Sequence, residues 1–443
     1  MGRNWLLGGA LGAELALLAS ASWFGDFAVP WNARIFVGLM LAAGICFLAG
    51  MAILERSAAG ETTGPGFWLE PRRVAGFWIV AVALRLAMLG TAPGDDMWRY
   101  LWEGRVQLAG HNPYVLSPSA PELTALRDAN WQKINHPGSA AIYPPAAELA
   151  LAGIARVSSD SLLWFKATFI TADLLTLLLL VRMTGSYLQT AWYAWNPAVI
   201  YAFAGGGHYD SLMLLAMTAS LYLLTRAASD AGQPPRWGPA WLSAACLGIA
   251  IALKLVPIFL APVWLCALGR RSVVLVAAAA IPLLLSLPYG GPVTVLQPLR
   301  AFADVTRFHD LIWWLVEAIT IPNPYGRNWP FTVALVIALV IATVRFRHDW
   351  KRCALWLLGL TLVLSPVLHP WYASWILPLA CWQRAHAWTV LSLSALSAFL
   401  LWESTSLWTA WEPNLLTRLM VLLPPLAAWG LQSRLARRHS PQP

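Results

Sequence analysis

Two adjacent acids stand at the start of the longest polar stretch of the chain. Asp95 and Asp96 follow directly after an apolar segment, and Arg99, Tyr100 and Glu103 come within the next turns of a helical pattern. A carboxylate in such a position can take a proton from an attacking hydroxyl group, and a nearby cation can stabilise a departing phosphate. One acid would suffice to cap a helix, so the pair indicates a site that does chemistry.

Residues of the same kinds occur farther along this stretch, which covers residues 92–142. The helical pattern from Asp96 ends at the turn His111-Asn112-Pro113-Tyr114, and His136-Pro137 and Tyr143-Pro144-Pro145 lead into the next apolar segment. Aspartate, arginine, histidine and tyrosine are the side chains that a sugar-phosphate site requires. A stretch of about fifty residues is long for a structureless loop, which favours a functional role.

The composition indicates what must position these residues. Of the 443 residues, 58% are hydrophobic and 12% are charged, whereas a soluble domain carries roughly 25% charged residues. The apolar residues form repeated blocks, many of them near the roughly 20 residues that a helix needs to cross a bilayer. Because the backbone must satisfy its own hydrogen bonds there, we expect an all-α polytopic transmembrane helical bundle of about 12–14 spans. Residues 1–443 would form a single integral membrane domain.

Basic residues cluster in short loops between apolar blocks, which marks those loops as cytoplasmic. These residues are Arg56, Arg72, Arg73, Arg226, Arg236, Arg270, Arg271, Arg345, Arg347, Lys351 and Arg352, together with Arg434, Arg437 and Arg438 in the C-terminal tail. All lie on one side only if one block between 143 and 205 fails to cross, and Asn196-Pro197 marks 190–205 as a broken or re-entrant helix. The outer side then carries the 92–142 loop, a second outer loop at 290–327, and the pairs His208/Asp210 and His369/Trp371.

The outer loop also resembles a known family. The run from Asp95 to Arg105, followed by Gly110-His111-Asn112-Pro113-Tyr114 and Tyr143-Pro144-Pro145, resembles the first outer loop of GT-C glycosyltransferases. It looks closest to the bacterial polyprenol-phosphate-mannose-dependent mannosyltransferases. Further elements that resemble this family follow in order: Trp195-Asn196-Pro197, Gly207-His208-Tyr209-Asp210, Lys254-Leu255-Val256-Pro257, and Ser365-Pro366-Val367-Leu368-His369-Pro370-Trp371-Tyr372.

The resemblance implies an activity and a place in the cell. In such families an outer-loop aspartate is the catalytic base, and Asp96 has the matching four-residue spacing to Tyr100, with Asp95 as the alternative. The enzyme would transfer a hexose, mannose by the resemblance, to a lipid-linked or glycan acceptor. It would lie in the bacterial inner membrane among membrane lipids, with its active site extracytoplasmic.

The donor follows from where the site faces. Nucleotide sugars are absent outside the cytoplasm, so the donor would be a polyprenyl-phosphate sugar, and direct displacement with one base would invert the anomeric centre. Lys254 lies at the end of an apolar block, where a charge is costly and suggests a cavity or partner. The residues expected to bind the donor phosphate or sugar are Arg99, Arg105, His111, His136, Tyr143, His208, Asp210, Lys254, Arg307, His309, His369, Trp371 and Tyr372.

Other chemistries find less support in the sequence. The five cysteines all lie inside apolar blocks, no nucleotide-binding glycine motif follows a strand, and no nucleic-acid-binding motif occurs. Adjacent acids could bind a divalent ion, but a donor with one phosphate requires less charge neutralisation than a pyrophosphate, so we predict neither a metal site nor a cofactor. Two alternative functions stay open: a secondary transporter, and a polymerase or ligase of lipid-linked glycans.

Overall fold

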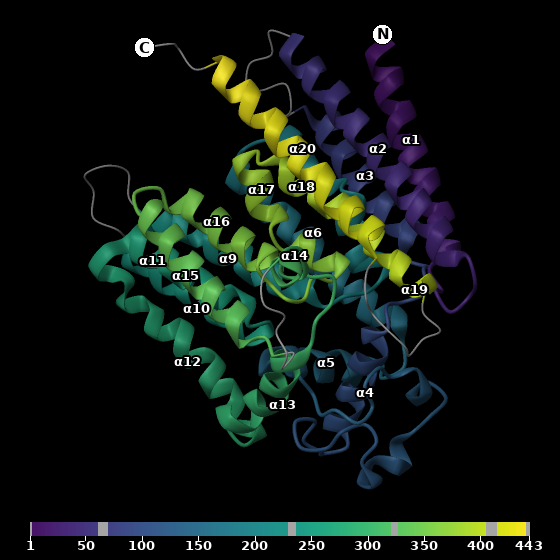
Figure 1. Ribbon diagram of the computed structural model, residues 1–443, viewed down its shortest axis with the longest axis vertical. Helices are drawn as coiled ribbons and strands as arrows, with labels where there is room; N and C mark the ends of the chain where they lie inside the picture. Colours follow the sequence, from purple (N-terminus) through teal and green to yellow (C-terminus); the bar gives the residue numbers. More distant parts are fainter. Residues whose placement is uncertain (1, 61–69, 229–235, 320–326, 405–413, 440–443) are drawn as a thin grey trace. The chain divides into compact units, whose positions relative to one another are not determined.

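A computed structural model describes residues 2–60, 70–228, 236–319, 327–404 and 414–439 (Figure 1). Over these ranges the regular structure is helical and includes no β-strand. Five helical stretches are long and apolar enough to cross a membrane: Trp5–Phe24, Asn32–Ala58, Leu162–Thr184, Val256–Tyr289 and Leu415–Arg434. Three shorter apolar helices are Trp237–Leu253, Trp329–Arg345 and His386–Leu400. The expected all-α polytopic bundle is confirmed, whereas the number of 12–14 crossings stays a prediction.

The chain divides into two compact units, each made of segments that are far apart in the sequence. The first contains Met1–Ala92, Leu180–Gly206 and Val367–Pro443, and the second contains Pro93–Leu179 and Gly207–Pro366. The expectation that residues 1–443 form a single domain therefore stays a prediction. All residues of the 92–142 outer loop from Pro93 onward belong to the second unit.

The first unit begins with three long helices, α1, α2 and α3, of which α1 packs against both others (Figure 1). Its helices are α1 (Gly2–Ala21), α2 (Asn32–Gly60), α3 (Pro71–Met88), α7 (Tyr187–Ala194), α8 (Pro197–Ile200), α17 (Leu377–Gln383), α18 (His386–Ala395), α19 (Leu401–Ser404) and α20 (Leu415–His439). A π-helical turn, η5 (Tyr201–Gly205), follows α8, and a 3₁₀ turn, η9 (Pro370–Ser374), precedes α17. Proline opens α3 and α8 at their first position, where its missing N–H costs nothing.

The predicted interruption of the 190–205 block is confirmed. α7 ends at Ala194, and Asn196 caps the next helix by accepting hydrogen bonds from the backbone N–H groups of Ala198 at 2.8 Å and Val199 at 3.4 Å. The buried Arg85 donates from Nη1 to the carbonyl oxygen of Ala194 at 2.8 Å, which satisfies one of the carbonyls left open where α7 ends.

The second unit contains the outer loops and the helices that support them. Its helices are α4 (Asp96–Leu108), α5 (Pro145–Val157), α6 (Leu162–Thr184, up to Leu179), α9 (Asp210–Ala227), α10 (Trp237–Leu253), α11 (Ala261–Leu268), α12 (Leu275–Ser286), α13 (Pro292–Val305), α14 (Trp313–Ile319), α15 (Trp329–Arg345) and α16 (Trp350–Val363). α10 packs against both α9 and α12, and α4 packs on α5.

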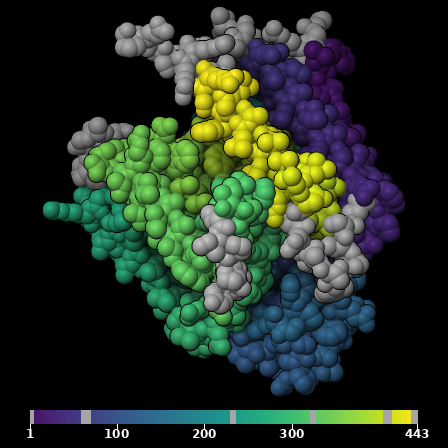
Figure 2. Space-filling model, in the orientation of Figure 1, coloured from purple at the N-terminus to yellow at the C-terminus, as the bar shows by residue number. Residues whose placement is uncertain are grey.

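Apolar side chains of this unit remain uncovered on several helices. On α15 they are Trp329, Val333, Val336, Ile337, Val340, Ile341 and Val344, and on α12 they include Val276, Leu283 and Leu284. In Figure 2, α15, in green, lies at the surface of the molecule on the side shown. A surface of this kind suits helices that contact lipid chains instead of water.

α4 begins where the sequence predicts. Asp95 precedes it and accepts a hydrogen bond from the N–H of Asp96, and both acids lie at the positive end of the helix dipole. The helix ends at Leu108, and Gly110, just beyond the capping residue Ala109, has a φ of +82° in the left-handed region that glycine adopts without strain. The first outer loop therefore starts with a helix that carries the two acids at its N-terminus.

The rest of this loop has a small hydrophobic core of its own. Trp102 and Val106 of α4 pack with Leu123 and Ile134, and Trp98, Leu116, Ala120, Leu126 and Trp131 pack against that cluster. Arg105 fixes the far side, since it is paired with Asp128 at 2.9 Å and with Asp160 and donates to the carbonyl oxygen of Leu126 at 3.2 Å. The loop is thus an ordered body packed on α4.

The second outer loop folds back on the residues at the start of the SPVLHPWY element and just before it. The N–H of Phe308 donates to the carbonyl oxygen of Pro366 at 3.0 Å, and Trp313 Nε1 donates to that of Leu364 at 2.8 Å. Asp310 accepts a hydrogen bond from the N–H of Trp314 at 3.0 Å, which caps α14. Residues 320–326 of this loop lie outside the described ranges.

Substitution of Gly104 should separate α4 from α5. A Cβ on Gly104 would lie 2.8 Å from both the Leu151 carbonyl oxygen and the Ala155 Cβ, and the backbone atom cannot yield. We expect Gly104→Ala to destabilise the protein by about 1–3 kcal/mol, measured as thermal unfolding of the purified protein in detergent.

Gly153→Ala is the matched control, because a Cβ there meets nothing within 4 Å and α5 should tolerate or gain from alanine. Equal melting temperatures of the two variants would contradict the close approach at Gly104.

Candidate active site

Asp95 and Asp96 both contact a loop residue, Asn135, that the sequence analysis did not single out. Asn135 donates from Nδ2 to Asp95 Oδ2 at 3.1 Å and to Asp96 Oδ1 at 3.1 Å. His208 lies on another side of Asp96, with Nδ1 3.8 Å from Asp96 Oδ2. Asp96 is half-buried, with 23% of its side chain exposed, so one face stays open to an incoming molecule.

Gly207 allows His208 to come this close to α4. Its φ is +72°, and a Cβ at this position would lie 2.2 Å from the Met97 Cε and 3.3 Å from the Lys166 Cγ. Only glycine combines that backbone conformation with that space. The GHYD element therefore depends on its glycine to bring its histidine beside Asp96.

A cation–carboxylate pair completes the polar part of the cluster. α10 ends at Leu253, and Lys254, in extended conformation, donates from Nζ to Asp210 Oδ1 at 2.6 Å. Asp210 is the first residue of α9 and is fully buried, and Lys254 is 16% exposed. The ammonium group also lies 5.3 Å from the centroid of the Tyr209 ring. The partner that the sequence led us to expect for an intramembrane lysine is Asp210.

Three tyrosines form a triangle beside these charges. The ring centroids of Tyr100, Tyr143 and Tyr209 are 5.2–5.4 Å apart, and each pair meets edge to face. Burial, followed by the negative charge of Asp96, raises the pKa of Tyr100 and Tyr143 well above the ordinary range of a phenol. Both hydroxyl groups therefore stay protonated and can donate hydrogen bonds.

The electrostatic surroundings shift Asp96 toward neutrality. Burial, followed by the charge of Asp95, raises the pKa of Asp96 to about 7, and the more distant Asp210 acts in the same direction. The hydrogen bond from Asn135 and the charge of Lys254 act in the opposite direction. A carboxyl group with a pKa near neutrality is a stronger base than an ordinary aspartate and is still substantially ionised at neutral pH.

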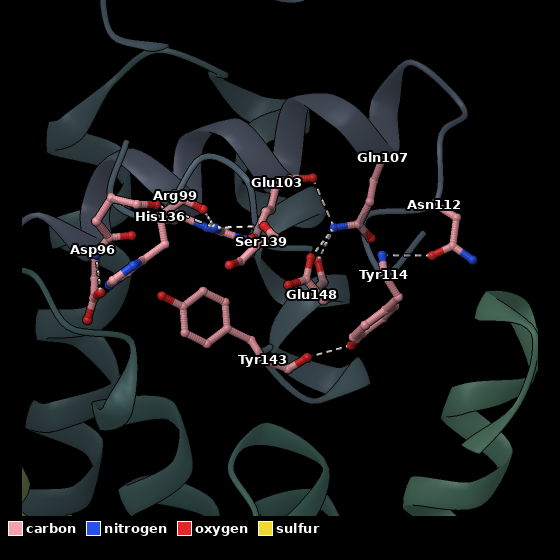
Figure 3. A network of polar contacts seen from close by, with 11 residues as sticks. Asp96, Arg99, Glu103, Gln107, Asn112, Tyr114, His136, Ser139, Tyr143 and Glu148 are labelled. Atoms are coloured by element: carbon pink, nitrogen blue, oxygen red, sulfur yellow. Dashed lines mark hydrogen bonds and ion pairs between the residues drawn. The ribbon is translucent and has the colours of Figure 1, made fainter. Parts of the chain in front are cut away.

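Arg99 is engaged inside the loop. It donates to Glu103 Oε1 from Nε at 2.9 Å and from Nη2 at 2.5 Å, and from Nη1 to the carbonyl oxygens of His136 at 3.2 Å and Ser139 at 3.1 Å (Figure 3). Its side chain is 5% exposed. The geometry gives Arg99 a structural role and lends no support to the predicted contact with a donor phosphate.

The network continues from Glu103 across to α5. Gln107 Nε2 donates to Glu148 Oε2 at 2.8 Å, and Gln107 Oε1 accepts from the Tyr289 hydroxyl at 2.6 Å. The carboxyl groups of Glu103 and Glu148 are in hydrogen-bond contact, and the two residues are 2% and 0% exposed. Burial, followed by the charge of Glu103, raises the pKa of Glu148 well above the ordinary range of a glutamate, so Glu148 is the neutral member of the pair.

Three other predicted donor-binding residues of this loop lie away from the acids or point outward. Arg105 is nine residues after Asp96, roughly 13 Å farther along the helix axis, and is held by Asp128 and Asp160. His111 follows the end of α4. His136 is exposed, and its ring lies 6.4 Å from that of Phe302. Donor binding by these three side chains stays a prediction.

The second outer loop holds its predicted residues in local contacts. Arg307 donates to Glu317 Oε2 at 2.8 Å and to Asn328 Oδ1 at 3.2 Å, and its guanidinium lies over the Phe331 ring at 4.7 Å. His309 is 2% exposed and has a φ of +48°. Donor binding by Arg307 and His309 stays a prediction.

The SPVLHPWY element places its aromatic residues in the first unit. His369 stacks on Trp371 with ring centroids 4.5 Å apart and meets Tyr372 edge to face at 5.1 Å. Tyr372 in turn stacks on Trp375 at 4.0 Å. His369, Trp371 and Tyr372 therefore pack together, and sugar binding by them stays a prediction.

Within the part of the chain that the structure describes, no group of three or more histidine, cysteine, aspartate or glutamate side chains is arranged to hold a metal ion.

Comparison with known proteins identifies the family. The sequence model for the alpha-(1->6)-mannopyranosyltransferase N-terminal domain matches residues 4–270, more than half of the chain. The chain belongs to this mannopyranosyltransferase family. Asp95, Asp96, Asn135, His208 and Lys254 all lie inside the matched residues. The resemblance to GT-C mannosyltransferases, drawn from the sequence motifs, is thereby confirmed.

Two curated members of the family are similar over most of this chain. Alpha-(1->6)-mannopyranosyltransferase B of Corynebacterium glutamicum is 25% identical over 405 residues, which cover 79% of this chain and 65% of the relative. Alpha-(1->6)-mannopyranosyltransferase A of Mycobacterium tuberculosis is 28% identical over 403 residues, which cover 79% of this chain and 72% of the relative. The chain thus spans about two thirds to three quarters of the length of these relatives.

Sequence reasoning did not single out several polar residues of the second unit. Glu148 is an acid inside an apolar block. A charge in an apolar block was the reason for selecting Lys254, and the same reason would have selected Glu148. Lys166 and Asp173 of α6 carry the same signal, and both are buried. Asn135 carried none, because an amide in a loop is ordinary until its partners are known.

The location of the proton in the buried Glu103–Glu148 pair can be tested with amide substitutions. We expect Glu148→Gln to change stability by less than about 0.5 kcal/mol, because an amide has the shape of a protonated carboxyl group and can still donate to Glu103. Glu103→Gln should cost about 2 kcal/mol, because Arg99 loses the charge on its closest acceptor. Thermal unfolding at neutral pH measures both.

Glu148→Ala serves as the control for packing, and it should be clearly destabilised by the cavity it leaves. If Glu148→Gln were as unstable as Glu103→Gln, the proton assignment would be wrong.

Proposed function

We propose that this chain is an inverting mannosyltransferase that moves a mannosyl group from a polyprenyl-phosphate-mannose donor to a lipid-linked or glycan acceptor. Asp96 is the general base. The observation that carries the proposal is a half-buried carboxyl group with a pKa near 7, close to His208 and to the Lys254–Asp210 pair. All four residues lie within the part of the chain that the family model matches.

Asp96 takes the proton of the acceptor. As the acceptor hydroxyl oxygen attacks the anomeric carbon, its O–H bond breaks and the proton moves to the Asp96 carboxylate. The open face of Asp96 gives room for that hydroxyl group. General-base catalysis of this kind contributes roughly 10²–10⁴-fold to the rate.

The leaving group is the lipid phosphate. The bond between the anomeric carbon and the phosphate oxygen breaks, its electron pair stays with that oxygen, and negative charge grows on the phosphate. Asp210 holds the Lys254 ammonium at 2.6 Å, which keeps a positive charge at the site, and His208 supplies polar N–H donation nearby. Cations fixed in advance stabilise such charge without reorganisation during the reaction.

The sugar and the linkage come from the relatives, both of which are named alpha-(1->6)-mannopyranosyltransferases. A single displacement inverts the anomeric centre, so a β-linked donor gives an α-linked product. An α-(1→6) product requires a primary hydroxyl group as acceptor, the least hindered hydroxyl of a hexose. The lipid-linked donor follows if the 92–142 loop faces outside the cytoplasm, where nucleotide sugars are absent.

The proposal is tested by transfer from radiolabelled polyprenyl-phosphate mannose to a mannose-containing acceptor, with purified protein in lipid. We expect Asp96→Asn to lower the transfer rate at least 10²-fold, because an amide cannot take the proton. Asp95→Asn should have a smaller effect.

Glu122→Gln is the matched control, an exposed carboxylate of the same loop that should be exchanged without loss. Full transfer by Asp96→Asn would remove Asp96 as the base, and full loss in Asp95→Asn alone would move that role to Asp95.

The side of the membrane is tested by labelling single cysteines. A cysteine at Glu122, exposed in the first outer loop, should react with a membrane-impermeant maleimide in intact spheroplasts. A cysteine at Arg347, in a basic loop predicted to be cytoplasmic, should react only after the cells are opened.

The native cysteines are replaced by serine or alanine first, and labelling of each position after lysis controls for reactivity. Protection of the Glu122 position until lysis would place the loop in the cytoplasm and exclude an outward-facing enzyme.

A further inference from the structure

Two acid pairs lie along α4, and they are neutralised in different ways. Glu103 and Glu148 are in contact and buried, and the raised pKa of Glu148 leaves that residue neutral. Asp95 and Asp96 are instead joined through the amide of Asn135, whose Nδ2 is 3.1 Å from an oxygen of each. One amide group carries two N–H donors, so it can serve both acids at once.

A donor placed between two acids changes what they can do. Each N–H bond favours the ionised carboxylate, whereas without it two close acids hold a proton between them. A carboxyl group that already holds a proton cannot accept another from a substrate. The amide of Asn135 therefore favours the ionised form of Asp96, which can accept a proton from a substrate.

Asn135 is itself held in place from both sides. Ile134 is buried in the loop core, and the carbonyl oxygens of Asn135 and His136 accept from Arg99 Nη1 at 3.5 Å and 3.2 Å. The same nitrogen donates to Ser139 at 3.1 Å, and Glu103 fixes the guanidinium (Figure 3). The segment that presents the amide to the acids is thus fixed by a buried ion pair one helical turn after Asp96.

We propose that Asn135 is a positioning residue for glycosyl transfer, which keeps Asp96 ionised and oriented as the proton acceptor, and that the Arg99–Glu103 pair serves to hold Asn135 there. This inference rests on the proposed role of Asp96 as base. Neither Asn135 nor Arg99 needs to contact the substrate in this role.

Other titratable and charged groups also lie around Asp96 and affect its pKa. They are Asp95 on the same helix turn, His208 and Asp210 at the start of α9, Lys254 after α10, and the hydroxyl groups of Tyr100 and Tyr143, with Lys166 of α6 beside Gly207. Substitution of Asn135 leaves all of them in place, so a change in the pH profile reports on the amide.

The test is the pH dependence of single-turnover mannosyl transfer by the full chain in lipid. The wild-type rate should rise with pH through about 7, as Asp96 ionises. In Asn135→Ala this rise should move to higher pH by about one unit, because loss of a hydrogen bond to a carboxylate raises its pKa. The rate should then fall roughly 10-fold near pH 6 and recover to near wild type at high pH.

Asn135→Asp is the second variant, because it keeps the size of the side chain and adds a third carboxylate; its rise should move farther than that of Asn135→Ala. Asn130→Ala is the matched control, because Asn130 lies in the same loop and its amide oxygen accepts a hydrogen bond from Lys133 Nζ at 3.3 Å at the surface. The pH profile of this variant should match that of the wild type.

Uniform loss of rate at every pH in both Asn135 variants, with the rise unmoved, would reduce Asn135 to a folding role and overturn the inference. So would wild-type profiles in both, or a wild-type enzyme without any rise. Retained transfer in Asp96→Asn would instead overturn the proposed function. Loss in Asp96→Asn together with an unmoved rise in the Asn135 variants would overturn only the positioning role.

Discussion

The structure of the second unit depends on one electrostatic constraint. Carboxyl groups that are buried away from water must be neutralised by groups at fixed positions. Asp96 meets this constraint with an amide from the loop, a histidine after a glycine turn, and the lysine that follows α10. These groups come from three distant parts of the sequence. The close packing of α4 on α5, the left-handed Gly207 and the end of α10 at Leu253 are what bring them together.

Basic residues of the loop divide between two tasks. Arg99 and Arg105 organise α4 and its loop through buried or half-buried ion pairs, whereas Lys254 faces the site from a different element. A guanidinium with five N–H donors can bind several carbonyl oxygens at once, as Arg99 does, and this suits it to hold a loop. Lys254, with a compact charge, is held by Asp210, and under the proposed function it would face the departing phosphate.

Much of the fold was available from the sequence, and so was the centre of the site. The apolar blocks predicted the helical bundle, Asp95-Asp96 predicted the start of α4, and Asn196-Pro197 predicted the interruption after α7. The ordered motifs predicted Asp96, His208, Asp210 and Lys254 as site residues, and the structure brings these together. The role of Arg99 and the contact of Asn135 could not be predicted from the sequence. Residue type does not show which cation pairs with groups of the protein itself and which one faces a ligand. These roles are set by contacts between residues about forty positions apart in the sequence, and a local sequence pattern does not reveal such contacts.

The hydrophobic core of the first outer loop has a consequence for substrate recognition. Trp102, Val106, Leu123 and Ile134 are already packed, and Arg127 and Lys133 already lie over Trp131 and Trp98. The conformational entropy of ordering this segment is therefore lost when the protein folds and not when a ligand arrives. Under the proposed function, a lipid-borne sugar would meet a preorganised surface, and its binding free energy would remain available to orient the reacting atoms.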